Sequence, residues 1–111
     1  MIVTKSKDNL VEFDNGLEFF GIGDNDCCAV NYLDFEQLPV GTELPTMTAK
    51  QLAKKITVKG DGFAVKDING VPKWVQARSC QNGYYSSNTT AYLKYKGEKI
   101  ELGEVVGEDY E

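Results

Sequence analysis

The most informative segment for the fold is Val71–Tyr95, VPKWVQARSCQNGYYSSNTTAYLKY. Its first part alternates with a period of two, which is typical of a β-strand that buries one face. One face would carry Trp74, Gln76, Arg78 and Cys80, and the other would carry Val75, Ala77 and Ser79. Asn82-Gly83 then favours the positive φ angles of a tight two-residue turn. We therefore predict a β-hairpin whose return strand begins at Tyr84-Tyr85.

Turn signals on either side of this segment predict further antiparallel strands. Asp14-Asn15-Gly16 separates Leu10–Phe13 from Leu17–Ile22, and this pattern is typical of a hairpin. Asn69-Gly70 follows the strand predicted over Phe63–Ile68, and Lys96-Gly97 precedes the strand predicted over Lys99–Val106.

The segment from Cys28 to Leu38 is ambiguous between a strand and a helix. Its apolar residues fit the period of two and the period of 3.6 only in part. We predict a strand over Cys28–Leu33. Pro39, Gly41 and Pro45 then indicate a loop.

One helix is predicted, over residues 48–56. Thr48-Ala49-Lys50-Gln51 matches a capping box, and one apolar stripe follows at helical spacing: Ala49, Leu52, Ala53 and Ile56. Short antiparallel strands with one helix indicate an α+β fold, in which a twisted antiparallel β-sheet of hairpins has the helix packed on it. We expect a single domain over residues 1–106 and a frayed, acidic C-terminal tail over residues 107–111.

Length and composition restrict the classes of function. A chain of 111 residues suits one domain, and no apolar run approaches the ~20 residues of a membrane-spanning helix. The net charge of −5 argues against direct nucleic-acid binding, because neutralisation of phosphates by Lys and Arg supplies most of that affinity. The first ten residues have an early acid, Asp8, and no apolar core of a signal peptide, which favours an intracellular protein.

Three cysteines, Cys27, Cys28 and Cys80, are an odd number in such a chain and argue against a disulfide framework. The alternative is a metal site that combines these thiols with Asp24 or Asp26. Structural zinc sites usually contain paired C-x₂₋₄-C ligands, whereas this sequence has no such pair and no histidine. We therefore predict free cysteines that pack as small apolar side chains, with no metal and no other cofactor.

The lack of histidine also bears on catalysis. A cysteine nucleophile would have no imidazole partner, and acid–base chemistry would fall to groups such as Asp24, Asp26 and Asp34. Acidic residues close to turns more often accept hydrogen bonds from the local backbone. We therefore predict that the protein is not an enzyme and has no catalytic residues.

The predicted hairpin carries the candidate ligand-binding residues, which combine aromatic rings, a guanidinium and an amide: Trp74, Arg78, Asn82, Tyr84 and Tyr85. Such a set can stack on a base and bind its phosphates through charge-assisted hydrogen bonds. The alternative is architectural, with the rings packed across strands and Arg78 paired with a surface carboxylate.

Two short motifs, Asp26-Cys27-Cys28 and Asn82-Gly83-Tyr84-Tyr85-Ser86, together with the apolar segment Tyr32–Phe35, resemble a group of small phage and prophage proteins of unknown function. The chain departs from that group between Pro39 and Ile56, where the capped helix replaces a more acidic, strand-like segment. The resemblance implies a viral or mobile-element origin and the cytoplasm of a bacterial host. No catalytic residues come with it.

By analogy with small phage proteins, we expect a counter-defence sponge that sequesters a nucleotide-derived immune signal, so that the partner is a nucleotide-like small molecule. The alternatives are a protein-binding inhibitor of a host enzyme, whose partner is a host protein, and a phage structural or accessory component. We expect neither direct nucleic-acid binding nor membrane binding. Assembly into a homo-oligomer is compatible with the sequence.

Overall fold

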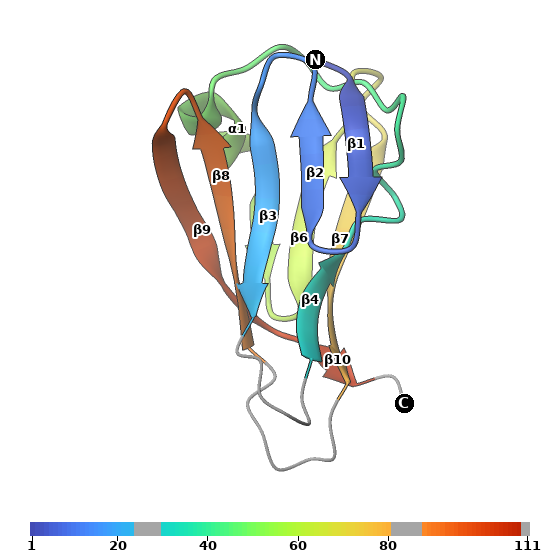
Figure 1. Ribbon diagram of the computed structural model, residues 1–111. Coiled ribbons are helices and arrows are strands. Elements are labelled where there is room, and N and C mark those ends of the chain that lie inside the picture. The colour runs from blue at the N-terminus through green and yellow to red at the C-terminus, as the bar shows by residue number, and fades with distance from the viewer. Residues whose placement is uncertain (24–29, 81–87, 110–111) are drawn as a thin grey trace.

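In the part of the chain that the structure describes, ten strands form two five-stranded sheets that face each other (Figure 1). The computed structural model describes residues 1–23, 30–80 and 88–109. The first sheet has the order β1 (Val3–Lys7), β2 (Leu10–Phe13), β3 (Glu18–Gly23), β8 (Asn88–Tyr95) and β9 (Glu98–Val106). The second has the order β10 (Glu108–Asp109), β7 (Pro72–Cys80), β6 (Gly62–Lys66) and β5 (Thr57–Lys59), and β4 (Val30–Asp34) pairs with β7. All pairs are antiparallel except β10 with β7.

The core lies between the two sheets and is built from the inward-facing residues of alternating strands. Phe19 of β3 makes edge-to-face contacts with two other aromatic rings. The centroid of its ring is 5.0 Å from that of Phe35 and 6.1 Å from that of Phe63. Leu33, Val75 and other apolar residues beside these rings are fully buried. The two sheets are therefore held by one shared hydrophobic core, which covers one face of each.

The helix α1 (Ala49–Lys55) begins as the sequence predicts. The Thr48 hydroxyl accepts the Gln51 N–H at 3.3 Å, and the Gln51 side chain accepts the Thr48 N–H at 3.0 Å, which confirms the capping box. Ala49 and Leu52 are buried in the core. Figure 1 shows α1 at the end of the sandwich where β8 turns into β9.

The local hairpin predictions are confirmed at three turns. β2 pairs with β3 after Asp14-Asn15-Gly16, β6 pairs with β7 across Asn69-Gly70, and β8 pairs with β9 across Lys96-Gly97. Lys96 and Gly97 both have positive φ, 50° and 80°, as a primed turn requires. The predicted strand over 28–33 is confirmed where the structure describes it, since β4 begins at Val30.

The predicted hairpin over Val71–Tyr95 is wrong, because its two strands belong to different sheets. β7 pairs with β6 and β4, whereas β8 pairs with β3 and β9. The alternation along β7 is nevertheless correct, with Val75, Ala77 and Ser79 buried. The predicted turn at Asn82-Gly83 lies outside the described residues.

The fold class is therefore confirmed only in its coarser form, as antiparallel sheet with one short helix. Instead of one sheet, two sheets cover each other, and α1 packs against β8 and β9 near one end of the sandwich. Each sheet needs an apolar cover for its buried face, and a helix of seven residues is too short to supply it. Within the expected tail, Glu108–Asp109 form β10 beside Arg78 and Ser79.

Candidate binding face

The outward-facing residues of β7 and its neighbour β4 form the candidate site, which we call the Trp74 face. It consists of three residues of β7 and two of β4: Trp74, Gln76, Arg78, Tyr32 and Asp34. The strand register brings them together, because Tyr32 is opposite Arg78 and Asp34 is opposite Gln76. All five side chains are partly exposed.

The indole of Trp74 is held in place from two sides. Its Nε1–H donates to Oε1 of Gln76 at 2.7 Å, and Nε2 of Gln76 in turn donates to the carbonyl oxygens of Asp61 and Ala77, each at 3.0 Å. The ring also lies close against Gly62, where an added Cβ would be 2.5 Å from Cζ2 of Trp74. A glycine on β6 therefore provides the space that the indole occupies.

The side chain of Gln37, which follows β4 in the chain, provides a hydrogen-bond acceptor for the backbone of β7. The last residue pair between β4 and β7 is Asp34 with Gln76. The part of β7 before Gln76, which includes Trp74, therefore does not pair with β4. Oε1 of Gln37 accepts the Trp74 backbone N–H at 2.9 Å. A side chain thus replaces a strand at this position and keeps the backbone under the indole ordered.

Arg78 of β7 forms an ion pair with Asp34 of β4, which is two residues along the strand from its direct register partner Tyr32. Its Nε lies 3.3 Å from Oδ2 of Asp34, and the two side chains are 26% and 18% exposed. The other carboxylate oxygen of Asp34 accepts the Glu36 N–H at 2.9 Å, which fixes the acid at the start of the following loop. The guanidinium is therefore oriented by an acid that is itself anchored.

The structure brings together two of the five candidate residues named from the sequence, Trp74 and Arg78, on one face. Asn82, Tyr84 and Tyr85 lie outside the described residues. Sequence reasoning did not include Tyr32 and Gln76 among the ligand-binding residues. The signal for Tyr32 was its spacing of two from Asp34, which was obscured by the helical period in the same segment.

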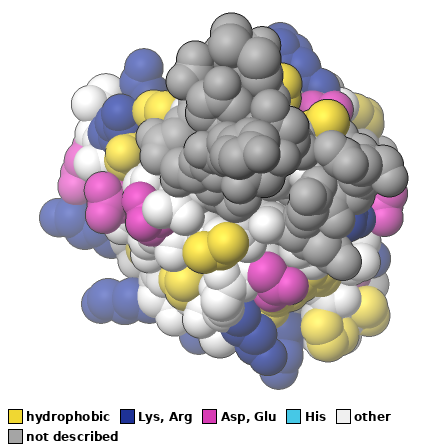
Figure 2. Space-filling view, turned by 90° about the horizontal axis from the view of Figure 1, so that it is seen from below, with side chains coloured by type: hydrophobic (Ala, Val, Ile, Leu, Met, Phe, Trp, Pro, Cys, Tyr) yellow, Lys and Arg dark blue, Asp and Glu magenta, His cyan; other side chains and the backbone are white. Residues whose placement is uncertain are grey.

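Both sequence motifs on which the predicted resemblance depends, Asp26–Cys28 and Asn82–Ser86, lie outside the described residues. Figure 2 views the molecule from the end at which β3 finishes and β4 and β8 begin, and it shows hydrophobic side chains and charged side chains of both signs on this face. Three exposed apolar residues belong to strand sections at this end: Ile22, Val30 and Val106.

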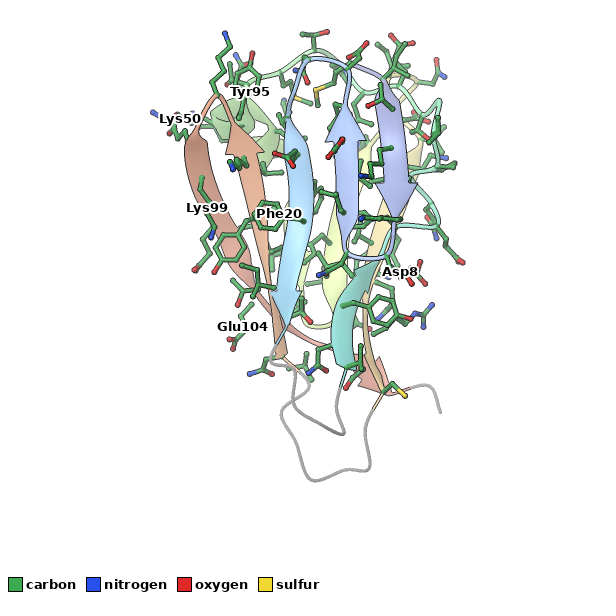
Figure 3. All side chains as sticks on the ribbon, viewed as in Figure 1. Asp8, Phe20, Lys50, Tyr95, Lys99 and Glu104 are labelled. Carbon is green, nitrogen blue, oxygen red and sulfur yellow. The ribbon has the colours of Figure 1, made fainter. Side chains whose placement is uncertain are left out.

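A second aromatic surface lies on the outer face of the first sheet. Phe20 and Tyr92 are register partners on β3 and β8, and their rings stack with centroids 5.6 Å apart. The Lys99 ammonium lies 4.2 Å from the Tyr92 centroid and 5.9 Å from that of Phe20 (Figure 3). These contacts are cross-strand packing with a cation–π contribution, so this surface serves as an aromatic control for the Trp74 face.

The described residues contain no group of three or more Cys, Asp and Glu side chains placed to hold a metal ion. Cys80 is a free, exposed thiol, so the prediction that it packs as a small apolar side chain is wrong for this residue. It faces outward because it shares the orientation of Trp74 and Arg78 along β7. Cys27, Cys28, Asp24 and Asp26 lie outside the described residues.

In the part of the chain that the structure describes, no helix has the length and apolar character needed to cross a membrane. Compared with protein-family models, curated proteins and solved structures, the chain matches none of them. The resemblance of its motifs to phage proteins therefore stays a prediction.

Proposed function

We propose that the protein is a non-catalytic binding protein of a phage or prophage, and that it engages a protein of its bacterial host through the Trp74 face. The observation that carries this proposal is the fixed arrangement of Trp74, Arg78 and Tyr32 on paired strands. Trp, Tyr and Arg are the residue types that dominate binding energy at protein interfaces. Their presence on one partly exposed face is thus suited to a partner protein.

Preorganisation supports the same proposal. The indole is hydrogen bonded to Gln76 and the guanidinium is paired with Asp34, so both side chains are ordered before any partner binds. Ordering a rotamer-rich side chain on binding costs about 0.5–1.5 kcal/mol, and this cost is reduced where the free protein already holds the conformation. A sheet face also supports its side chains more rigidly than a loop does.

The spacing on β7 favours a protein over one small ligand. Trp74 and Arg78 are four residues apart on the strand, so their Cα atoms are roughly 13 Å apart at ~3.3 Å per residue. Gln76 lies between them. A protein surface can contact both ends of such a row at once.

The test is affinity capture from bacterial lysate on the immobilised protein, with the captured partner identified by mass spectrometry. Trp74→Ala should abolish capture, whereas Tyr92→Ala, which removes an aromatic ring from the other sheet, should retain it. With the purified partner, Trp74→Ala should raise Kd by at least about 30-fold, the scale of a ~2 kcal/mol hot spot. Equal capture by both variants would contradict a site on the Trp74 face.

A second candidate function is sequestration of a nucleotide-derived immune signal on the same face. It is favoured by an aromatic ring and a guanidinium on one strand face, which can stack on a base and bind a phosphate. A thermal-shift screen with cyclic nucleotides and ADP-ribose derivatives tests it, because a ligand at 100 times its Kd adds about 2.7 kcal/mol of stability. No shift with any compound of the panel would exclude these ligands and leave the protein partner.

A further inference from the structure

A groove next to the Trp74 face opens between α1 and the β6–β7 hairpin. It has a volume of about 880 Å³, within the range of small-molecule sites. Apolar groups from three segments line it, among them Met47, Val65, Ile68 and Pro72. The segment that leads into α1 forms one wall and the β6–β7 turn forms the other.

The charges that line the groove are mainly positive, although the chain as a whole carries −5. Lys54 and Lys55 come from the last turn of α1, and Lys66 comes from the end of β6. Among the residues that the structure describes, none of these three lysines takes part in an ion pair. Lysines near the end of a helix are common, but Lys66 belongs to a strand and so has no such explanation.

The acid in the groove lining is already engaged in the turn. Oδ1 of Asp67 accepts the backbone N–H groups of Asn69 and Val71, each at 2.9 Å. Oδ1 of this carboxylate therefore stabilises the β6–β7 turn, and Asp67 forms no ion pair with Lys54, Lys55 or Lys66 among the described residues. The groove thus combines an apolar lining with ammonium groups that have no partner within the described chain.

We propose that this groove binds a small amphiphilic anion, a molecule with an apolar body and a phosphate or carboxylate head group. The apolar body would cover Met47 and Ile68, and the head group would lie between the lysines. A lysine ammonium group acts as a point charge and can bind either a phosphate or a carboxylate, whereas bidentate binding of one head group would require the planar guanidinium of arginine. Neither Trp74 nor Arg78 lines the groove, although Ala64, which does line it, is the register partner of Trp74. The inference concerns a different ligand from the partner proposed for the Trp74 face.

The test is an amide NMR titration of the intact protein with decyl phosphate, decanoate and inorganic phosphate. Either amphiphile should shift the amides of Met47, Lys54 and Ile68, with a Kd on the order of 0.1–1 mM for a ligand of this size. The tighter of the two amphiphiles identifies the preferred head group. Inorganic phosphate should bind at least about tenfold more weakly, because it buries no methylene groups.

Two double variants with the same net charge make the assignment specific. Lys54→Gln with Lys66→Gln should raise the Kd of the preferred amphiphile at least about tenfold, as expected for lost charge-assisted contacts. Lys5→Gln with Lys7→Gln removes two exposed lysines of β1, which belongs to the other sheet and does not line the groove, so Kd should change less than about twofold. Absence of shifts at the groove, equal Kd values in the two double variants, or equal binding of inorganic phosphate would overturn the proposal.

Discussion

Asn9 ties the two sheets together by hydrogen bonding Leu33 in both directions. Its backbone N–H donates to the Leu33 carbonyl at 2.8 Å, and its side-chain Oδ1 accepts the Leu33 N–H at 3.1 Å. On its other side Asn9 exchanges hydrogen bonds with Gly21 of β3, through its carbonyl and its Nδ2. Asn9 thus lies between β3 of one sheet and β4 of the other.

We predict that Asn9 is a major determinant of stability. Asn9→Gly can retain the positive φ of 73° but leaves the Leu33 N–H without its acceptor, so the free energy of unfolding should fall by about 1–3 kcal/mol. Asn9→Ala loses the same hydrogen bonds and should lower it by a further ~1–2 kcal/mol, because the left-handed conformation is sterically unfavourable for alanine. Urea unfolding of both variants measures the two terms separately. Wild-type stability in Asn9→Ala would refute this role.

Gly62 should be required for the position of the indole. A Cβ there would lie 2.3 Å from the Val75 carbonyl oxygen and 2.5 Å from Trp74, so Gly62→Ala should destabilise by about 1–3 kcal/mol through overpacking. Because Trp74 is the chain's sole tryptophan, its emission spectrum should change as well. Gly60→Ala is the matched control, since no atom lies within 4 Å of its Cβ position and its stability and emission should be unchanged.

One substitution in the β8–β9 turn, Lys96→Asn, should stabilise the protein. Lys96 adopts a positive φ of 50°, for which asparagine is better suited, and Lys96→Asn creates the preferred Asn-Gly pair. The gain is partly offset by the loss of the Lys96 ammonium above the Tyr95 ring, 5.3 Å from its centroid. We expect a net rise of up to about 1 kcal/mol in the free energy of unfolding, the scale of the relieved strain. A lower melting temperature would argue against the primed turn.

Arg78 and Asp34 should be coupled in stability, and Arg78 should matter more for binding than for folding. A double-mutant cycle of Arg78→Gln and Asp34→Asn, each of which removes one charge, is expected to give a coupling energy of about 0.5–1 kcal/mol, since both side chains are partly exposed. Affinity for the partner should fall by about 1–3 kcal/mol in Arg78→Lys, because a lysine cannot reproduce the guanidinium geometry. Affinity equal to that of the parent would remove Arg78 from the binding face.

Local sequence was sufficient for the features that a few neighbouring residues control. The capping box at Thr48 and the turn at Lys96-Gly97 depend on hydrogen bonds and φ angles within four residues, and both are present as predicted. The burial of alternate residues on β7 also followed from its period of two, because successive side chains point to opposite faces. The same period placed Trp74 and Arg78 on one face.

The pairing of strands that no short turn joins, and the surroundings of the candidate site, could be known only from the tertiary structure. The aromatic pattern of β7 and β8 is compatible with a direct hairpin, yet β8 joins β3, where Leu93 and Phe19 are register partners buried in the core. Asp34 reaches Arg78 only because β4 pairs with β7 across a long sequence separation. Turn residues determine how the chain reverses, whereas sheet membership is determined by the apolar surface that two faces bury together, and that quantity belongs to the whole fold.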